Sequence, residues 1–287
     1  MIASQAGKLP VKLMCRVASV SRSGYYAARR RPESLRAMEN RRLVAQIEAI
    51  HGEDHKDSYG SRRMHVELVA RGLRCDRHRV ERLMRRHGIR AARRPPAVRR
   101  HEDDVPERDT LVPDLLCRDF AVALPNRVWL GDITQFATRE GVLYLAFLLD
   151  LCSRMIVGWA GGATKDRWLT IGVLEMALGW RQPPKELIHH TDQGGQYACA
   201  DYTAVLRGHG ALASMSRAGT PLDNAPMESF IKTFKVEFVR LHSFDTRKEA
   251  LTEAGKYLQL FYNCERRHSA LGYLSPAEYE KQLRTPA

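Results

Sequence analysis

The stretch RVWLGDITQF, residues 127–136, is short, apolar and rich in residues that favour β-strands. Two similar runs follow it, at residues 142–149 and 155–160. Three strands so closely spaced along the chain predict an antiparallel meander. The first of them carries a carboxylate, Asp132, inside an otherwise apolar run.

Downstream of the meander, helical and strand patterns alternate. Residues 168–180, 198–206, 223–241 and 248–265 have helical spacing, and 186–191 and 212–216 are strand-like. This order predicts an α/β domain over residues 126–287, with a mixed five-stranded sheet and helices on both faces. Four tryptophans are expected in its core: Trp129, Trp159, Trp168 and Trp180.

The front of the chain is predicted to be all-helical. Residues 1–35 form a basic helical segment, and residues 36–92 contain two helical patterns that flank the break at Arg71 and Gly72. The second pattern carries Arg77, Arg79 and Arg82, which predicts a DNA-binding helix-turn-helix. The alternative is a solvated basic helix packed on its own domain. Residues 93–125, rich in proline and charge, are predicted to be a linker.

The charge distribution favours a nucleic-acid partner. The 287 residues carry a net charge of +13, and residues 1–100 hold 25 Lys and Arg against 9 Asp and Glu. The apolar run at 143–163 contains Asp150 and Arg154, so buried strands are expected there rather than a membrane span. Six single cysteines and no export-signal pattern favour reduced thiols in the cytoplasm.

Three carboxylates of the second domain can converge. Asp132 lies in the first strand, Asp192 just after the fourth, and Glu228 one turn into a long helix. Such oxygen ligands suit Mg²⁺ or Mn²⁺, and two ions ~3.5–4 Å apart can activate an attacking oxygen and stabilise a leaving one. Each residue also has a plainer interpretation: Asp132 as an acid at a strand edge, Asp192 as a turn former, and Glu228 as a helical partner of Lys232.

Several neighbours of the three carboxylates are weaker candidates for a functional role. Lys235 lies on the helix face of Glu228 and is a candidate contact for DNA phosphate, as are Arg266 and Arg267 after the last predicted helix. A cap of the long helix is the favoured role of Asp223 and Asn224. His190 is expected to be a hydrogen-bonded structural residue, and Asp150 to pair within a turn with Ser153 or Arg154.

The order of motifs resembles the transposases of bacterial insertion sequences that carry an integrase core. The match is closest to the second-reading-frame (OrfB-type) subunit and covers nearly the whole chain. The residues that carry it are Trp129-x-x-Asp132-Ile133-Thr134, Asp150-x-x-Ser153-Arg154, His190-Thr191-Asp192-Gln193-Gly194, Asp223-Asn224-Ala225, Glu228-Ser229-Phe230, Lys235-x-Glu237, Tyr262-Asn263-x-x-Arg266-Arg267-His268, and Tyr59-Gly60-Ser61-Arg62-Arg63.

The resemblance implies a ribonuclease-H-like fold and a DDE-type enzyme with Asp132, Asp192 and Glu228 as catalytic metal ligands. It also implies DNA cleavage at the ends of an insertion element, then attack of the freed 3′-hydroxyl on a new phosphodiester. Expected partners are DNA, an upstream-frame subunit or fusion, and further copies of the chain on DNA, with no membrane. The expected location is the bacterial cytoplasm at the nucleoid.

Two alternatives to this function remain at the level of the sequence. One is a DNA-binding protein without chemistry, either a regulator or a decayed transposase. The other is a nuclease of the same fold that does not join DNA. The zinc-binding His-His-Cys-Cys module found in front of related viral integrases is absent from the sequence, and no leucine-heptad segment is visible.

Overall fold

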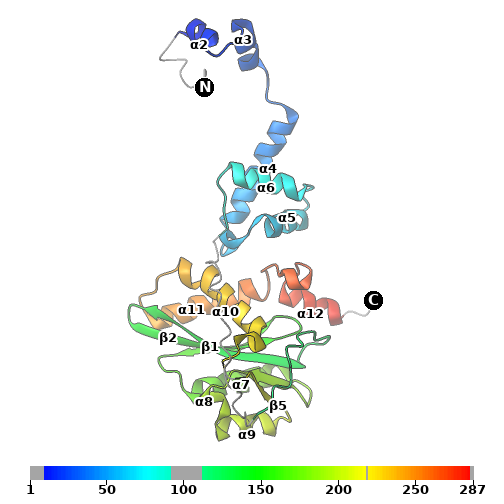
Figure 1. Cartoon of the computed structure of the whole chain (residues 1–287), viewed down its shortest axis with the longest axis vertical. Coiled ribbons are helices and arrows are strands. Elements are labelled where there is room, and N and C mark those ends of the chain that lie inside the picture. The colour runs from blue at the N-terminus through cyan, green and yellow to red at the C-terminus, as the bar shows by residue number, and fades with distance from the viewer. Residues whose placement is uncertain (1–9, 92–111, 218, 285–287) are drawn as a thin grey trace.

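The computed structural model describes residues 10–91, 112–217 and 219–284, and Figure 1 shows their arrangement. The front of the chain is helical, as predicted. Its helices are α2 (Val11–Val17), α3 (Arg22–Arg30), α4 (Leu35–His51), α5 (Ser61–Ala70) and α6 (Arg77–Arg86), with a short helix η1 (Lys56–Ser58) before α5. Ser21 and Ser34 cap α3 and α4, since their hydroxyls accept bonds from Gly24 N and Ala37 N.

The break between α5 and α6 lies where the sequence predicts it. Gly72 has φ +82°, a left-handed conformation that glycine adopts without strain, and Gly88 has φ +72° just after α6. Fully buried Ile47, Met64 and Val80 hold α4, α5 and α6 together. The helix-turn-helix region therefore contributes its own share of apolar core.

The sheet has the five strands that the sequence predicts. Its strands are β1 (Val128–Thr138), β2 (Gly141–Asp150), β3 (Ile156–Gly162), β4 (Ile188–Thr191) and β5 (Leu212–Met215). They lie side by side in the order β3-β2-β1-β4-β5. The pairs β1–β2 and β2–β3 are antiparallel, which confirms the meander, whereas β1–β4 and β4–β5 are parallel. Strand β1 thus lies in the middle of the sheet.

Helices cover both faces of this sheet because β2 is apolar on both sides. Ala146 and Leu148 pack with α7 (Arg167–Arg181) and α9 (Ala200–Gly208), and a short α8 (Gly195–Ala198) lies beside them. Leu145 and Phe147, which alternate with those residues, pack with α10 (Ala225–Glu237) and with the segment from α11 (Arg247–Lys256) through the π-helix η4 (Tyr257–Tyr262). Figure 1 shows α7–α9 and α10–α11 on opposite sides.

Two helices differ from the sequence prediction. The long helix α10 ends at Glu237 instead of Leu241, since the next residue, fully buried Phe238, leaves the helical conformation and stacks on Phe234 and Phe244. A further helix, α12 (Pro276–Arg284), was not predicted. Its signal is a capping box: Ser275 N donates to Glu278 Oε2, and Glu278 N donates to Ser275 Oγ.

Two of the four tryptophans expected in the core are at the surface. Trp129 is fully buried, but Trp168 and Trp180 on α7 are 63% and 60% exposed. Helical geometry explains Trp168, because it lies two residues before buried Thr170 and nine before buried Ala177, and therefore ~180–200° around the helix axis from them. None of the described helices is both long and apolar enough to cross a membrane.

The part of the predicted linker that the structure describes, residues 112–125, packs against the sheet domain. Leu116 is buried in the same apolar cluster as the helix-turn-helix region and the sheet. Leu115 N donates to Ser214 Oγ, and Met215 N donates to Pro113 O. The rest of the predicted linker, residues 93–111, lies outside the described residues. One continuous cluster therefore joins what the sequence divides into separate domains.

Candidate active site

Asp132 occupies the central strand β1. The parallel register pairs Trp129 with His189 and Leu130 with His190, so the same offset places Asp132 beside Asp192, just after β4. The chains approach closely here because residue 131 is glycine: a Cβ at Gly131 would lie 3.0 Å from side-chain carbons of His189 and Thr191. The Asp132 side chain is half-buried, and its Oδ1 accepts the Ile133 amide at 2.7 Å.

Asp192 is held by the turn that follows β4. Its Oδ1 accepts the Gly194 amide at 3.0 Å. A Cβ at Gly194 would lie 2.9 Å from that same oxygen, so a larger residue there would displace the carboxylate. Two carboxylates thus stand at neighbouring strand positions, each oriented by a backbone amide.

Glu228 comes from α10, which is tied to β1 at its start. Asn224 Nδ2 donates to the Gly131 carbonyl at 3.4 Å, directly before Asp132 in the chain, and Glu228 follows one helical turn later. Phe230 anchors the buried face of α10 edge-on against Phe147 of β2, with ring centroids 5.0 Å apart. Glu228 Oε2 pairs with Lys232 Nζ at 3.2 Å on the exposed side.

The three carboxylates act on one another electrostatically. Burial, and then the negative charge of Asp192 and more weakly that of Glu228, raise the pKa of Asp132 to about 6. Lys165, exposed in the loop before α7, acts in the opposite direction. Within residues 10–91, 112–217 and 219–284, no three acidic, histidine or cysteine side chains are close enough to bind one ion together. The arrangement is therefore open, with Glu228 turned toward Lys232.

The residues around the carboxylates are structural. His190 is buried, with Nδ1 2.8 Å from Ser214 Oγ and Nε2 3.0 Å from Ser216 Oγ, as expected for a hydrogen-bonded core histidine. Asp150 binds the Ser153 amide and hydroxyl within the predicted turn.

Asp223 and Asn224 do not cap α10 with their side chains, contrary to the sequence interpretation. Asp223 instead accepts bonds from Arg118 and Arg217. Although burial raises its pKa, these two guanidinium groups lower it to about 2. Asn224 acts as the tie to Gly131 described above.

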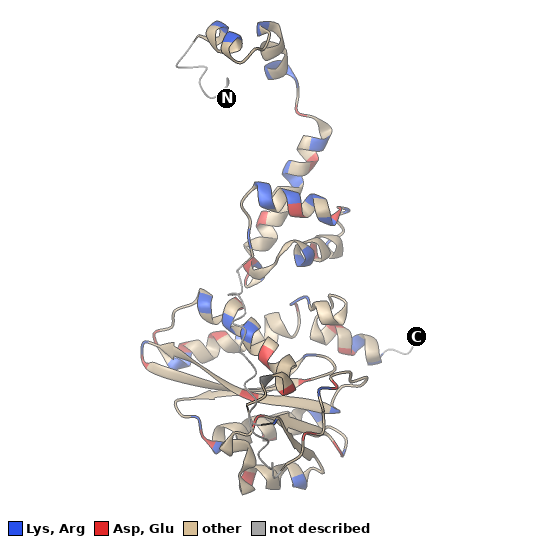
Figure 2. Cartoon of the chain, viewed as in Figure 1, with Lys and Arg blue, Asp and Glu red and all other residues tan. Residues whose placement is uncertain are grey.

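The candidate DNA contacts fall into two classes. Arg82 is exposed on α6, and Arg77 of α6 and Lys235 of α10 are half-exposed. Arg79, also on α6, binds Asn40 and Glu39. Figure 2 shows how basic residues follow the helices of the front region.

Arg266 and Arg267, in contrast, point into the protein. Arg266 is buried and pairs with Glu237, with nitrogen–oxygen distances of 2.6 and 2.7 Å. Arg267 pairs with Glu67 and Glu278. The sequence interpretation of these two arginines as DNA contacts is therefore not supported by their placement, because their guanidinium groups are already engaged by carboxylates.

Comparison with known proteins agrees with this architecture. A family model described as an integrase core domain matches residues 123–221, a second integrase core model matches residues 209–276, and an HTH-like domain matches residues 38–97. The transposase InsF of insertion sequence IS3A from Escherichia coli K12 is 37% identical over 286 residues, which is 98% of this chain and 97% of InsF. The chain belongs to the insertion-sequence transposases.

A second relative of the transposase gives the same result. The transposase of IS904 from Lactococcus lactis is 40% identical over 88% of this chain and 98% of its own length. The relatives and the family models confirm the resemblance to an OrfB-type subunit with a DDE-type integrase core, and with it the transposase function. Among solved structures, the catalytic core of HTLV-2 integrase in complex with magnesium has 16% identity and a TM-score of 0.39, over 57% of this chain and 98% of that one.

Sequence reasoning missed three residues that shape the site. Lys165 acts on Asp132, but no pattern marks a single exposed lysine in a loop. Arg63 and Glu237 join the HTH-like domain to α10, the helix that carries Glu228. Both belong to motifs that carry the family resemblance, Ser61-Arg62-Arg63 and Lys235-x-Glu237, yet nothing in the sequence indicates that they meet.

Proposed function

We propose that Asp132, Asp192 and Glu228 are the catalytic carboxylates of the transposase, and that they hold two Mg²⁺ or Mn²⁺ ions. The observation that carries the proposal is the convergence of β1, the end of β4 and the first turn of α10, held by the Asn224–Gly131 bond. Hard carboxylate oxygens fit these ions, and the pKa of Asp132 is raised by burial first and then by the negative charge of Asp192, two effects that a bound cation would offset.

Such ions supply an activated attacking oxygen and a stabilised leaving oxygen on a phosphodiester. The protein's own residues supply the positions. The Ile133 and Gly194 amides orient Asp132 and Asp192, and α10 presents Glu228 above them. Glu228 must turn from Lys232 toward the two aspartates to complete the site, a motion of one half-exposed side chain. The reaction is cleavage at the ends of the element followed by 3′-hydroxyl strand transfer.

DNA lies, in this proposal, along Lys235 near the carboxylates and along Arg77 and Arg82 of α6. Lys235 is seven residues after Glu228, so it lies on nearly the same side of α10. Phosphate contacts of this kind position DNA without reading its sequence. Arg79 is bound to Asn40 and Glu39 and so is a weaker candidate than its neighbours.

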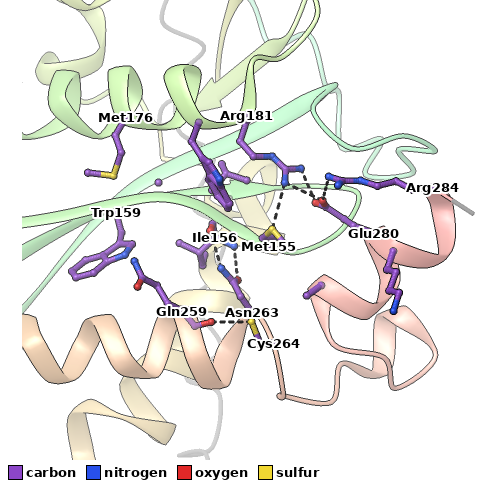
Figure 3. A pocket seen from close by; sticks show the side chains of 15 residues that line it. Met155, Ile156, Trp159, Met176, Arg181, Gln259, Asn263, Cys264, Glu280 and Arg284 are labelled. Carbon is purple, nitrogen blue, oxygen red and sulfur yellow. Dashed lines mark hydrogen bonds and ion pairs between the residues drawn. The ribbon is translucent and has the colours of Figure 1, made fainter.

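Further copies of the chain and an upstream-frame subunit or fusion are part of the same proposal, with the nucleoid as the place of action. Helix α7 leaves Trp168, Met176 and Trp180 exposed, a surface that favours protein contacts. Met176 and Trp180 also line a groove of about 610 Å³ between α7, β3 and the C-terminal helices (Figure 3). Assembly of two copies would place two active sites on the two ends of one element.

The test is an assay on oligonucleotides that carry the flanking element ends, with Mg²⁺ or Mn²⁺. We expect joined products from the wild type and none from Glu228→Gln. The variant should bind DNA nearly as tightly as the wild type does. Cleaved but unjoined DNA from the wild type would indicate a nuclease. Binding without products, repeated with the upstream-frame fusion, would indicate a DNA-binding protein without chemistry.

A further inference from the structure

A buried cluster of charges joins the HTH-like domain to the helix that carries Glu228. Glu237, in the last turn of α10, accepts a bond from Arg63 of α5 at 3.1 Å and two from Arg266, at 2.6 and 2.7 Å. Tyr257 donates its hydroxyl to the same carboxylate at 3.2 Å. The side chains of Glu237 and Arg266 are about 5% exposed. We call this group the Glu237 cluster.

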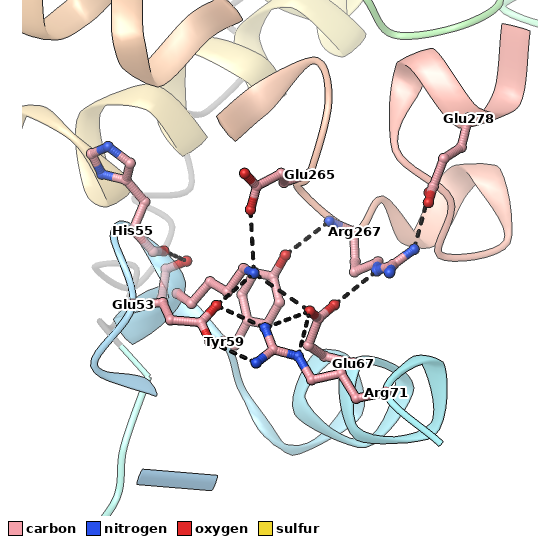
Figure 4. A network of polar contacts seen from close by, with 10 residues as sticks. Glu53, His55, Tyr59, Glu67, Arg71, Glu265, Arg267 and Glu278 are labelled. Atoms are coloured by element: carbon pink, nitrogen blue, oxygen red, sulfur yellow. Dashed lines mark hydrogen bonds and ion pairs between the residues drawn. The ribbon is translucent and has the colours of Figure 1, made fainter. Parts of the chain in front are cut away.

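A second network lies beside the Glu237 cluster and crosses the same boundary (Figure 4). Glu67 of α5 accepts bonds from Arg71 and from Arg267, and Arg267 continues to Glu278 near the start of α12. Tyr59 accepts the Arg267 amide at 3.1 Å through its hydroxyl oxygen. Residues from the front and from the far end of the chain therefore meet at two adjacent points.

Apolar and aromatic contacts fill the rest of the boundary. The ring of His55 lies 5.0 Å from that of Tyr257 and 5.2 Å from that of Phe261. His55 adopts φ +62°, a left-handed conformation that places it at the start of η1. Burial first, and the charge of His242 second, lower its pKa, so the ring packs there uncharged.

The position of Glu237 on α10 gives this boundary a consequence for the reaction. Glu237 follows Glu228 by nine residues, about 13 Å along one helix. A buried ion pair contributes little net stability against an apolar replacement, but it requires one specific geometry. The HTH-like domain is thus fixed to the catalytic helix, and hence to Glu228, by contacts that tolerate little displacement.

We propose that the Arg63–Glu237 contact is a positioning contact that sets which phosphodiester is cut. DNA gripped by the HTH-like domain then lies at a fixed distance from the catalytic carboxylates, and the cut falls at one place. This inference rests on the proposed function of Asp132, Asp192 and Glu228. Arg63 and Glu237 themselves touch neither the carboxylates nor the reacting DNA.

Arg63→Ala tests the contact, because the Arg63 side chain is 20% exposed and its loss leaves the Arg266–Glu237 pair intact. The matched control is Arg247→Ala, because the Arg247 side chain is 27% exposed and pairs with Glu140 away from the boundary. Cleavage of end-labelled DNA is mapped at single-nucleotide resolution, with the thermal melting of each variant recorded alongside. Arg63→Met, which keeps the aliphatic stem, is the second variant.

We expect Arg63→Ala and Arg63→Met to bind DNA within about threefold of the wild type, because no proposed DNA contact is removed. Their cuts should spread over neighbouring phosphodiesters, with the main position falling to roughly half of the product, since small displacements matter greatly in an active site. Arg63→Lys should restore part of the sharpness, and Arg247→Ala should cut as the wild type does. A single sharp cut from both Arg63→Ala and Arg63→Met would overturn the inference. Failure of the wild type to cut at all, both alone and as the upstream-frame fusion, would instead overturn the proposed function.

Discussion

Helix α10 carries two glutamates in opposite surroundings. Glu237 is buried, and two guanidinium groups and a tyrosine hydroxyl surround it; burial raises its pKa, but Arg266 and Arg63 lower it overall. Glu228 is half-exposed, its charge raises the pKa of Asp132, and among the ion pairs of the described residues it is paired only with exposed Lys232. A carboxylate that the chain neutralises itself holds the structure together, whereas a group of carboxylates left open can receive a cation from solution.

Glu237→Gln should have the largest effect on stability. It leaves Arg63 and Arg266 without their carboxylate, and removal of one partner of a buried ion pair costs about 3–5 kcal/mol. Chemical denaturation should show a loss of this size, while Glu228→Gln should leave the free energy of unfolding unchanged or slightly increased. Equal losses from both substitutions would remove the distinction between the two glutamates.

Magnesium should stabilise the wild type against unfolding. This stabilisation should depend on the open carboxylates and not on Glu237. At a free concentration 100 times its dissociation constant, a ligand that binds only the folded state adds about 2.7 kcal/mol. Thermal melting with and without Mg²⁺ measures this without any DNA. Glu237→Gln, if folded, should keep the response, and Asp132→Asn should lose it. A response that survives in Asp132→Asn would place the ion elsewhere.

Acid should weaken the Glu237 cluster. Burial, and then the charges of Arg266 and Arg63, lower the pKa of neighbouring His268 to about 2. In the unfolded chain His268 takes up a proton near pH 6.5, whereas in the folded protein its ring stays neutral down to about pH 2. The free energy of unfolding is therefore highest above pH 6.5 and decreases as the pH falls toward 2. Between pH 7 and 5 this amounts to roughly 2 kcal/mol for His268.

His268→Phe should flatten that dependence in denaturation curves recorded at each pH. The variant keeps a ring against Tyr262, whose centroid lies 4.8 Å from that of His268. An unchanged slope would mean that other groups carry the acid sensitivity of this part of the protein.

Lys232→Met should have the smallest effect. Its pair with Glu228 is exposed, and such pairs contribute about 0–1 kcal/mol. We expect an unchanged melting temperature within a few degrees and a Mg²⁺ response at least as strong as that of the wild type, because Glu228 no longer has a competing partner. A weakened response would show that Lys232 supports the site instead of competing for Glu228.

The sequence predicts the carboxylate site better than the domain boundary for a physical reason. Asp132 and Asp192 follow from strand patterns and short turns, which are local, and the strand order then brings them together. The pairs at the boundary join residues far apart in the chain: 174 positions separate Arg63 from Glu237, and 200 separate Glu67 from Arg267. No local pattern distinguishes a buried arginine from one that binds DNA, so the sequence alone does not show that Arg266 is buried. The exposure of Trp168, in contrast, follows from the helical phase alone.

The contacts of Arg267 also bear on how the chain is made. Helix α5 is translated early, but Arg267, which binds Glu67 of this helix and Tyr59 just before it, is translated some 200 residues later. Domains generally fold as units while the N-terminal part is made first. The hydrogen bonds of Glu67 and Tyr59 to the last part of the chain therefore form only after that part has been translated. A chain that ends before Arg266 would keep its basic helices and so still bind DNA. Because the contacts of Arg266 and the residues after it would be missing, such a truncated chain would not hold the bound DNA at a fixed position relative to the proposed active site.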